Sequence, residues 1–357
     1  MEFGSINLVV KDPDVALVTY LKMFGTNNVP EVIKLKGLTD TVDTVDGYYL
    51  KTKPVNLGIF KPRAATGRMG EYLNKYGEGI HHIQLHLGQD EFEETYNRFK
   101  NEGLKVSDKV VYVGKFSEAI FWLEESGNQG VPVKFATKTY HSLEMWKDTV
   151  YLDTPQKFEK VNITEEYPMP RVNLGTIMIT VKEWQKQQQV WADILSRPKL
   201  EIGDLSRLEE GKVDDKRGNI FMPVKYRFPG GGAINLYCAL NEDAPINKVM
   251  ASRGISVMYH NICSYVTRDR VHEYWRRLEE AGFAMVDPKP LLNSGSGNGN
   301  YFFFVHPIST HGVLYEIVSA YVMDEENRLS YDWSDSETYI VPPQVNTLGR
   351  SHLNQKK

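Results

Sequence analysis

The stretch Tyr301–Val318 has the sequence YFFFVHPISTHGVLYEIV, in which turn residues separate two apolar segments. Aromatic and β-branched residues fill its first five positions, and such residues favour a strand. His306-Pro307 ends that strand, because proline cannot donate to a strand ladder. Gly312 permits a tight return before the second apolar segment, so the stretch predicts a β-hairpin.

Glu316 lies in the second predicted strand and shares one strand face with Leu314 and Val318. A carboxylate among apolar neighbours needs a cation, a hydrogen-bond donor or a proton. Glu316 is therefore a candidate functional residue. The alternative is a structural acid satisfied by a Lys, Arg or Tyr side chain.

A second stretch, Gly77–Leu87, has the sequence GEGIHHIQLHL. The alternation of a strand places His82, Gln84 and His86 on one face and His81 on the other. Three polar side chains are thus predicted to line one strand face. The alternative for His81 and His86 is a hydrogen-bonded or surface histidine without a functional role.

One order of elements, a strand, a helix and three strands, occurs four times along the chain. The repeats begin near Ser5, Ile80, Gly175 and Met258. Each helix is indicated by apolar residues at helical spacing. Internal repeats of this kind indicate one structural module used several times. The sequence therefore predicts an α+β protein of four βαβββ modules.

The length of 357 residues suits two domains of two modules each. We predict a first domain over residues 1–145, a linker over 146–170, a second domain over 171–320 and a C-terminal tail over 321–357. The linker is indicated by its mixed polar composition with prolines and acidic residues.

The composition, 41% hydrophobic and 25% charged, is that of an ordinary globular protein. The net charge of -4, with both signs interspersed, argues against a nucleic-acid partner. No apolar run is long enough for a membrane span and the first residues do not resemble a signal peptide, so we expect a cytoplasmic protein. Cys238 and Cys263 are too few for a disulfide framework and are expected to be buried thiols.

The motifs GEGIHHI and HPISTHGVLYEIV resemble the vicinal oxygen chelate superfamily, and they look most like methylmalonyl-CoA epimerase. The tandem arrangement resembles 4-hydroxyphenylpyruvate dioxygenase and the extradiol dioxygenases. The resemblance implies that two modules pair edge to edge into a half-open barrel, giving two such domains. It also implies a divalent metal in each cleft, held by residues from the first and last strands of each module.

The resemblance places a histidine ligand at His82 and a carboxylate ligand at Glu316. The remaining family positions hold other residue types in this chain, namely Ser5, Asn56 and Lys134 in the first half and Thr176, Asn235 and Asn261 in the second. A charged lysine has no lone pair for a metal. His260 directly precedes Asn261 and is a further candidate for substrate binding. Its alternative, as for His81 and His86, is a hydrogen-bonded or surface histidine without a functional role.

The sequence leaves two module pairings open. If the first module pairs with the second and the third with the fourth, His82 shares a cleft with Lys134, and Glu316 shares one with Asn261. If the first pairs with the fourth and the second with the third, Glu316 still joins Asn261, while His82 and Lys134 join Thr176. Neither pairing assembles two histidines and a carboxylate, so a tight transition-metal site is disfavoured.

We therefore predict an enzyme that acts on a small carbonyl, acyl or aromatic compound by proton transfer, isomerisation or lyase chemistry through an enolate-like intermediate. Glu316, His82 and Lys134 are the predicted catalytic residues. Predicted substrate-binding residues are Asn56, Asn235, Asn261, His260 and His311. The alternatives are a non-haem iron dioxygenase and a metal-free small-molecule-binding protein.

The predicted cofactor is none or a divalent ion, Fe, Zn, Mn or Co, with His82 and Glu316 as its ligands if one binds. The predicted partner is a small-molecule substrate, without nucleic acid or membrane, and a homodimer is left open. His306 and His311 have an alternative role in forming the hairpin turn. The Gly-rich segment Asn293–Asn300 is expected to be a flexible hairpin or a lid rather than a phosphate-binding loop.

Overall fold

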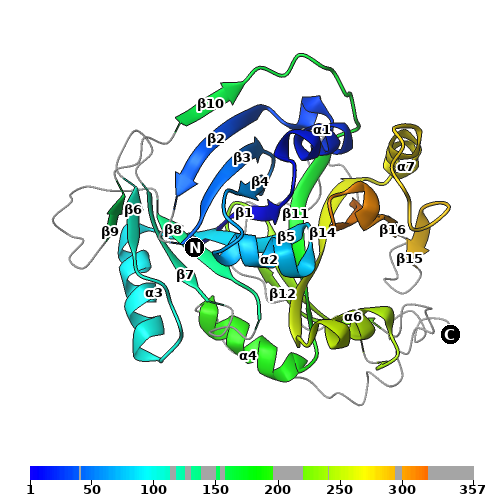
Figure 1. Cartoon of the computed structure of the whole chain (residues 1–357). Helices are drawn as coiled ribbons and strands as arrows, with labels where there is room; N and C mark the ends of the chain where they lie inside the picture. The colour runs from blue at the N-terminus through cyan, green and yellow to red at the C-terminus, as the bar shows by residue number, and fades with distance from the viewer. Residues whose placement is uncertain are drawn as a thin grey trace. The chain divides into compact units, whose positions relative to one another are not determined.

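A computed structural model describes residues 1–39, 42–112, 118–124, 130–137, 150–152, 157–195, 220–239, 241–293 and 300–320 (Figure 1). The predicted tail over 321–357 and most of the Gly-rich segment lie outside these residues. The chain divides into two compact units. The first comprises Met1–Leu174 together with His306–Val313. The second comprises Gly175–Val305 and, among the described residues, the segment from Leu314 to Ala320.

The first unit is built on a ten-stranded sheet, sheet A, with the strand order β10-β2-β3-β4-β1-β5-β8-β7-β6-β9. Its strands are β1 (Glu2–Val9), β2 (Glu31–Thr39), β3 (Thr44–Lys51), β4 (Asn56–Pro62), β5 (Gly79–His86), β6 (Val110–Tyr112), β7 (Glu118–Leu123), β8 (Val133–Thr137), β9 (Val150–Leu152) and β10 (Lys157–Val161). The sheet is mixed, because β1 pairs in parallel with β4 and antiparallel with β5, and β5 pairs in parallel with β8. The first module is therefore joined to the second through β1 and β5.

The second unit is built on a seven-stranded sheet, sheet B, with the strand order β12-β13-β11-β14-β17-β16-β15. Its strands are β11 (Val172–Val181), β12 (Ile220–Arg227), β13 (Ala233–Ala239), β14 (Val257–Thr267), β15 (Leu291–Asn293), β16 (Asn300–Val305) and β17 (Leu314–Ala320). The third module is joined to the fourth through β11 and β14. The sequence left two module pairings open. In the structure, the first module pairs with the second and the third pairs with the fourth.

Four helices follow the first strands of the four modules, as predicted: α1 (Pro13–Phe24), α3 (Gln89–Asn101), α4 (Trp184–Ile194) and α7 (Val271–Glu280). Asp12 caps α1, since its Oδ1 accepts hydrogen bonds from the backbone N–H groups of Asp14 and Val15 at 3.0 and 3.2 Å. Two further helices were not predicted, α2 (Arg68–Tyr76) and α6 (Pro245–Arg253). No described helix is long and apolar enough to cross a membrane.

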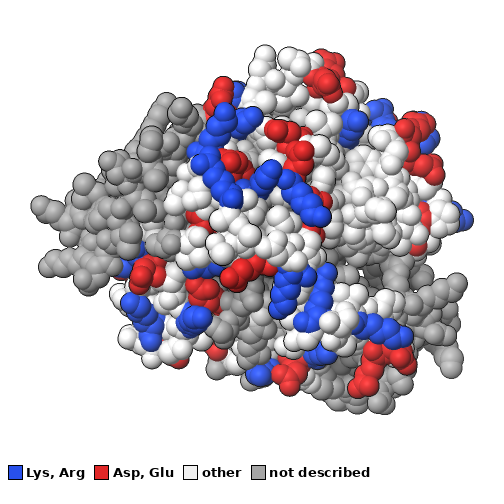
Figure 2. Space-filling model, viewed as in Figure 1, with Lys and Arg blue, Asp and Glu red and all other residues white. Residues whose placement is uncertain are grey.

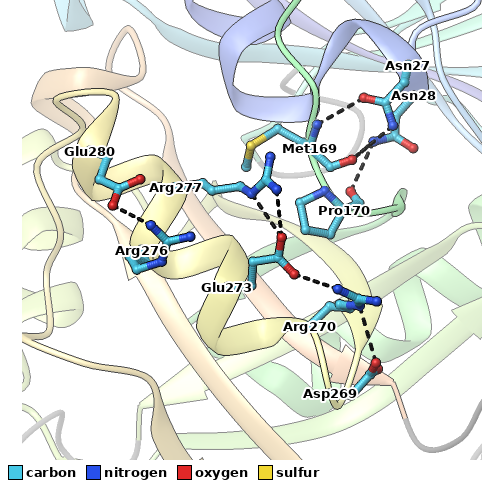
Figure 3. A network of polar contacts seen from close by, with 10 residues as sticks. All are labelled: Asn27, Asn28, Met169, Pro170, Asp269, Arg270, Glu273, Arg276, Arg277 and Glu280. Carbon is cyan, nitrogen blue, oxygen red and sulfur yellow. Dashed lines mark hydrogen bonds and ion pairs between the residues drawn. The ribbon is translucent and has the colours of Figure 1, made fainter.

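Ion pairs on the surface of α7 stabilise its helical turns (Figure 3). Glu273 accepts from Arg270 and Arg277 at 2.8 and 2.7 Å, at helical spacings of three and four residues. Such exposed pairs contribute little to stability, because water and salt screen the charges. On the face of the molecule shown in Figure 2, basic and acidic side chains lie among one another.

Met169 and Pro170 are held by the side-chain amides of Asn27 and Asn28, which follow α1 in the chain (Figure 3). Asn27 exchanges two hydrogen bonds with the backbone of Met169, at 2.9 and 3.0 Å, and Asn28 donates to the carbonyl of Pro170 at 3.0 Å. These bonds satisfy backbone groups that no strand ladder pairs. They hold part of the predicted linker against the first unit.

Aromatic side chains form the core between α3 and sheet A. Phe121 and Phe135 stack at 4.9 Å between ring centroids, with an interplanar angle of 12°. Phe92 and Phe99 of α3 meet Phe121 edge to face at 5.0 and 6.2 Å. All four side chains are fully buried, and each such ring removes a large apolar area from water.

Gly58 in β4 makes room for a polar side chain of the neighbouring strand. A Cβ atom at this position would lie 2.3 Å from Asn7 Oδ1 and 2.8 Å from the Phe60 ring. We predict that Gly58→Ala lowers the free energy of unfolding by about 1–3 kcal/mol, because the Asn7 amide or the strand must move. Urea unfolding measures the change.

Gly88→Ala is the matched control, since Gly88 has an ordinary φ of -63° and a Cβ atom there would meet nothing within 4 Å. If Gly58→Ala and Gly88→Ala have the same free energy of unfolding, the Asn7 amide does not require the absence of a side chain at Gly58.

Candidate functional site

A β-bulge in β5 decides the orientation of the histidine pair. In the antiparallel pairing of β1 with β5, Asn7 lies opposite His82, whereas the next residue, Leu8, lies opposite Ile80. His81 is therefore the extra residue of a bulge, where two residues of one strand oppose one residue of its partner. Strict alternation of side chains does not hold at this point.

Both imidazoles consequently lie in one cluster, so the expectation that His81 points to the opposite face is wrong. The Nδ1 atoms of His81 and His82 are 2.9 Å apart, within hydrogen-bond distance. The rings lie 6.2 and 4.6 Å from that of Trp122, and Tyr72 of α2 meets His81 at 5.2 Å. The unpredicted helix α2 thus covers this cluster.

Burial keeps both histidines uncharged. It lowers the pKa of His81 to about 3. A hydrogen bond with the backbone of Arg68 opposes this effect, whereas the positive charge of the Arg68 side chain adds to it. The pKa of His82 lies well below its usual value, first because of burial and then because of His81 and the positive charges of Lys134 and Arg68. Near neutral pH each ring is a hydrogen-bonding group rather than a cation.

Four of the polar residues form a row across sheet A. Ser5 pairs with Asn56 on one side and with Gln84 on the other, and Gln84 pairs with Lys134. Paired residues share a sheet face, which we call the His82 face because Asn7 and His82 form the next pair along it. The resemblance implies that His82 lies between Ser5 and Lys134 in this row, but the structure has Gln84 at that position.

The members of the row are held by local contacts. Asn56 Nδ2 donates to the carbonyl of Gly4 at 3.2 Å, and Ser5 Oγ donates to Asn7 Oδ1 at 3.1 Å. Gln84 Nε2 lies 2.8 Å from His86 Nε2. Apart from Asn56 and His86, which are half-buried, these side chains are buried.

In the second unit, Glu316 is held by Asn261. Asn261 Nδ2 donates to Glu316 Oε2 at 2.9 Å, although the residue paired with Glu316 in the ladder is Cys263. We call this side of sheet B the Glu316 face. Cys263 and Cys238 are buried free thiols, as predicted.

The Glu316 face is partly exposed to solvent along the paired strands β16 and β17. Along β17, Leu314, Glu316 and Val318 are partly exposed, while the residues between them are buried. Phe304 pairs with Glu316 and Phe302 with Val318, and both rings are partly exposed. A carboxylate thus lies in a partly apolar, aromatic strip within reach of solvent.

The other predicted residues of this half lie nearby in the sheet but in a shifted register. Asn235 pairs with Met178 rather than with Thr176. Thr176 Oγ1 lies 2.9 Å from the hydroxyl of Tyr265. His260 stacks on Tyr237 at 5.5 Å and 19°, and burial lowers the pKa of His260 to about 4.

His311 belongs to the turn segment His306–Val313, which groups with the first unit. Its Nδ1 lies 3.1 Å from Glu78 Oε2 and its Nε2 lies 3.2 Å from Thr19 Oγ1. Its backbone is in the left-handed region, with φ of 54°. Both ring nitrogens are therefore engaged in holding this turn.

The predicted catalytic residues divide between the two sheets. His82 and Lys134 lie on sheet A together with Asn56, whereas Glu316 lies on sheet B with Asn261, Asn235 and His260. The sequence did not predict Trp122, which lies beside Lys134 on sheet A, or Tyr265, which contacts Thr176 on sheet B. An aromatic residue in a predicted strand is equally typical of a core and of a functional site.

Comparisons with known proteins support the fold. No family model matches the chain, and no curated protein matches its sequence. Among solved structures, a mutant of 4-hydroxymandelate synthase from Streptomyces coelicolor superposes with a TM-score of 0.56 at 12% identity, covering 89% of this chain and 92% of that chain. The chain has the vicinal oxygen chelate fold.

A fusion protein of a xylose isomerase-like TIM barrel and 4-hydroxyphenylpyruvate dioxygenase has a similar structure over most of this chain. Its TM-score is 0.50 at 11% identity, over 92% of this chain and 51% of that chain. The prediction of an α+β vicinal oxygen chelate fold is therefore confirmed. At these identities the similarity concerns the fold alone.

The described residues of this chain do not fit the metal site that the resemblance to the vicinal oxygen chelate superfamily implies. On the His82 face, the row consists of two amides, a hydroxyl and the Lys134 ammonium, which would repel a divalent cation. On the Glu316 face, the carboxylate is accompanied by Asn261 and Cys263. No three His, Cys, Asp or Glu side chains of the described residues come together in a metal-binding group.

We predict that the purified protein holds far less than one equivalent of first-row metal, because neither face offers two imidazoles and a carboxylate. Elemental analysis of protein purified without chelators measures the content. Finding about one iron, zinc or manganese per chain, lost in Glu316→Gln, would reverse this conclusion.

The buried His81 predicts a loss of stability in acid. The unfolded chain binds a proton near pH 6.5, whereas the folded chain does so only near pH 3, so the unfolded state binds more protons between these values. The free energy of unfolding should therefore fall as the pH falls, by about 2 kcal/mol from His81 alone between about pH 7 and 5.

Urea unfolding of His81→Gln should lack this part of the loss, and the exposed His306→Gln should retain it. If His81→Gln and the unmodified protein lose stability equally between these pH values, His81 is already protonated in the folded state.

Proposed function

We propose that the chain is an enzyme that moves a proton on a small carbonyl, acyl or aromatic compound through an enolate-like intermediate. The observation that supports this proposal is the partly exposed Glu316 carboxylate in an aromatic strip, held in place by Asn261. Glu316 would act as the general base. A positioned carboxylate of this kind contributes about 10²–10⁴-fold to proton transfer.

The surroundings of Glu316 suit a small, partly apolar substrate. Phe302 and Phe304 offer ring faces and edges to a planar acyl or aromatic group. Tyr265, whose hydroxyl meets Thr176, pairs with Val318 and so shares the Glu316 face. A hydroxyl at this place can donate a hydrogen bond to an oxyanion as charge develops.

The hydrogen bond from Asn261 changes the role predicted for this residue. Its amide donates to Glu316, so Asn261 orients the base rather than the substrate. A carboxylate that is fixed before the substrate binds loses less rotational freedom in the transition state. Asn235, which lacks a hydrogen-bond partner for Oδ1 among the described residues, is buried on the same sheet.

A dioxygenase remains the second reading of the sequence. It would require iron ligands beside Glu316, and the described neighbours of Glu316 in the ladder are Cys263 and Phe304. Proton transfer needs only a base and an oxyanion donor, and Glu316 and Tyr265 are the candidates for these two roles.

A cytoplasmic location and a homodimer stay predictions.

Deuterium incorporation tests the proposal without knowledge of the natural substrate. The full chain is incubated in D2O with a panel of 2-oxo acids, aldehydes and acyl thioesters, and exchange next to the carbonyl is followed by NMR. We expect exchange in at least one class, and a loss of about 10²-fold or more in Glu316→Gln, which keeps the shape and removes the base.

Glu280→Gln on the surface of α7 is the control and should retain the rate. The melting temperature of Glu316→Gln should change little. A variant that unfolds, or one that keeps full exchange, would make Glu316 a structural residue. Saturable binding of panel compounds without exchange would instead indicate a binding protein.

A further inference from the structure

The His82 face of sheet A carries three buried polar groups that the proposed function does not use. Lys134, His82 and Asn7 are 6%, 1% and 0% exposed. Asn7 pairs with His82, and Lys134 pairs with Gln84, two residues along the same strand. The three side chains thus come from three adjacent strands, β1, β5 and β8.

The Lys134 ammonium has no counter-ion among the described residues, because none of their carboxylates lies within 4.0 Å of its Nζ atom. Lys109 of the same unit is equally buried, at 7%, but pairs with Glu93 at 2.9 Å. Burying a charge is costly unless a partner of opposite sign compensates it. Among the described residues, one buried lysine of this unit thus has a carboxylate partner and the other has none.

Asn7 adds a buried unsatisfied polar atom, and His82 adds a ring nitrogen without a hydrogen bond to a described residue. Asn7 Oδ1 accepts from Ser5, while its Nδ2 is buried without an acceptor in the described part of the chain. His82 uses Nδ1 toward His81, and no hydrogen bond joins its Nε2 to a described residue. Buried polar atoms are nearly always hydrogen-bonded in native proteins, so the fully buried Asn7 Nδ2 indicates a bound group.

We propose that the His82 face holds a small carboxylate anion that pairs with Lys134 and accepts from Asn7 Nδ2, with His82 Nε2 as the third polar contact. One ammonium compensates a single negative charge. A carboxylate has two oxygens, which match two separate donors. The site lies in the interior of the unit, because all three side chains are at most 6% exposed.

The neighbouring residues suit this ligand. Trp122 pairs with Lys134 in the ladder and lies 4.6 Å from His82, so it offers an apolar wall. An anion between this wall and the ammonium is shielded from water, which strengthens the charge pairing. The half-buried Asn56 and His86 lie at the more exposed end of the same face.

Thermal unfolding of the full chain with acetate tests the proposal. Sodium acetate replaces sodium sulfate at constant ionic strength, and chloride is titrated separately. We expect a saturable rise of the melting temperature with acetate. At an acetate concentration ten times the dissociation constant, the unfolding equilibrium constant should fall roughly tenfold.

Three variants give the matched comparison. Lys134→Met removes the charge and should abolish the response, whereas Lys109→Met removes the paired lysine and should retain it. Asn7→Asp has the shape of the natural side chain but repels the anion, so it should fold and lose the response. Glu316→Gln should respond like the unmodified protein, which separates this site from the proposed proton transfer.

A melting temperature that does not change with acetate, or a response that persists in Lys134→Met, would overturn the proposal and leave Lys134 as a buried charge without a bound anion. An equal saturable shift with chloride would overturn the carboxylate assignment.

Discussion

The antiparallel pairing of β1 with β5 is the interaction on which the first unit depends. A single βαβββ module would leave the edge of its first strand unpaired, and unpaired strand edges expose backbone donors and acceptors. Pairing the two first strands satisfies these groups and places β4, β1, β5 and β8 side by side. Residues from two modules, such as Ser5 and Gln84, thereby become neighbours.

The sequence predicted the strands of this arrangement well, because hydrophobic alternation and turn residues are local signals. It did not predict the register between strands. The bulge at His81 inserts one residue, which turns a side chain to the other face without changing the composition of the strand. The sequence likewise did not predict the register of β5 with β8, in which Gln84, and not His82, lies beside Lys134.

Helix α2 shows a second limit of sequence patterns. The segment Arg68–Tyr76 is short and has glycines on both flanks, at Gly67 and Gly77, so it resembles a connection. Its stability comes from packing, since Met69 and Tyr72 contact the apolar cluster around Trp122. A short helix that depends on tertiary contacts leaves little trace in helical propensity.

The two sheets have a similar order of strands at their centres, but they carry side chains of opposite charge. Sheet A buries a lysine among amides and uncharged imidazoles, whereas sheet B exposes part of a carboxylate among aromatic rings. A buried cation requires an anion, and a partly exposed, hydrogen-bonded carboxylate can exchange protons with a ligand. The chemistry of the two faces can therefore differ without a change of architecture, because a few side chains on neighbouring strands determine the charge of each face.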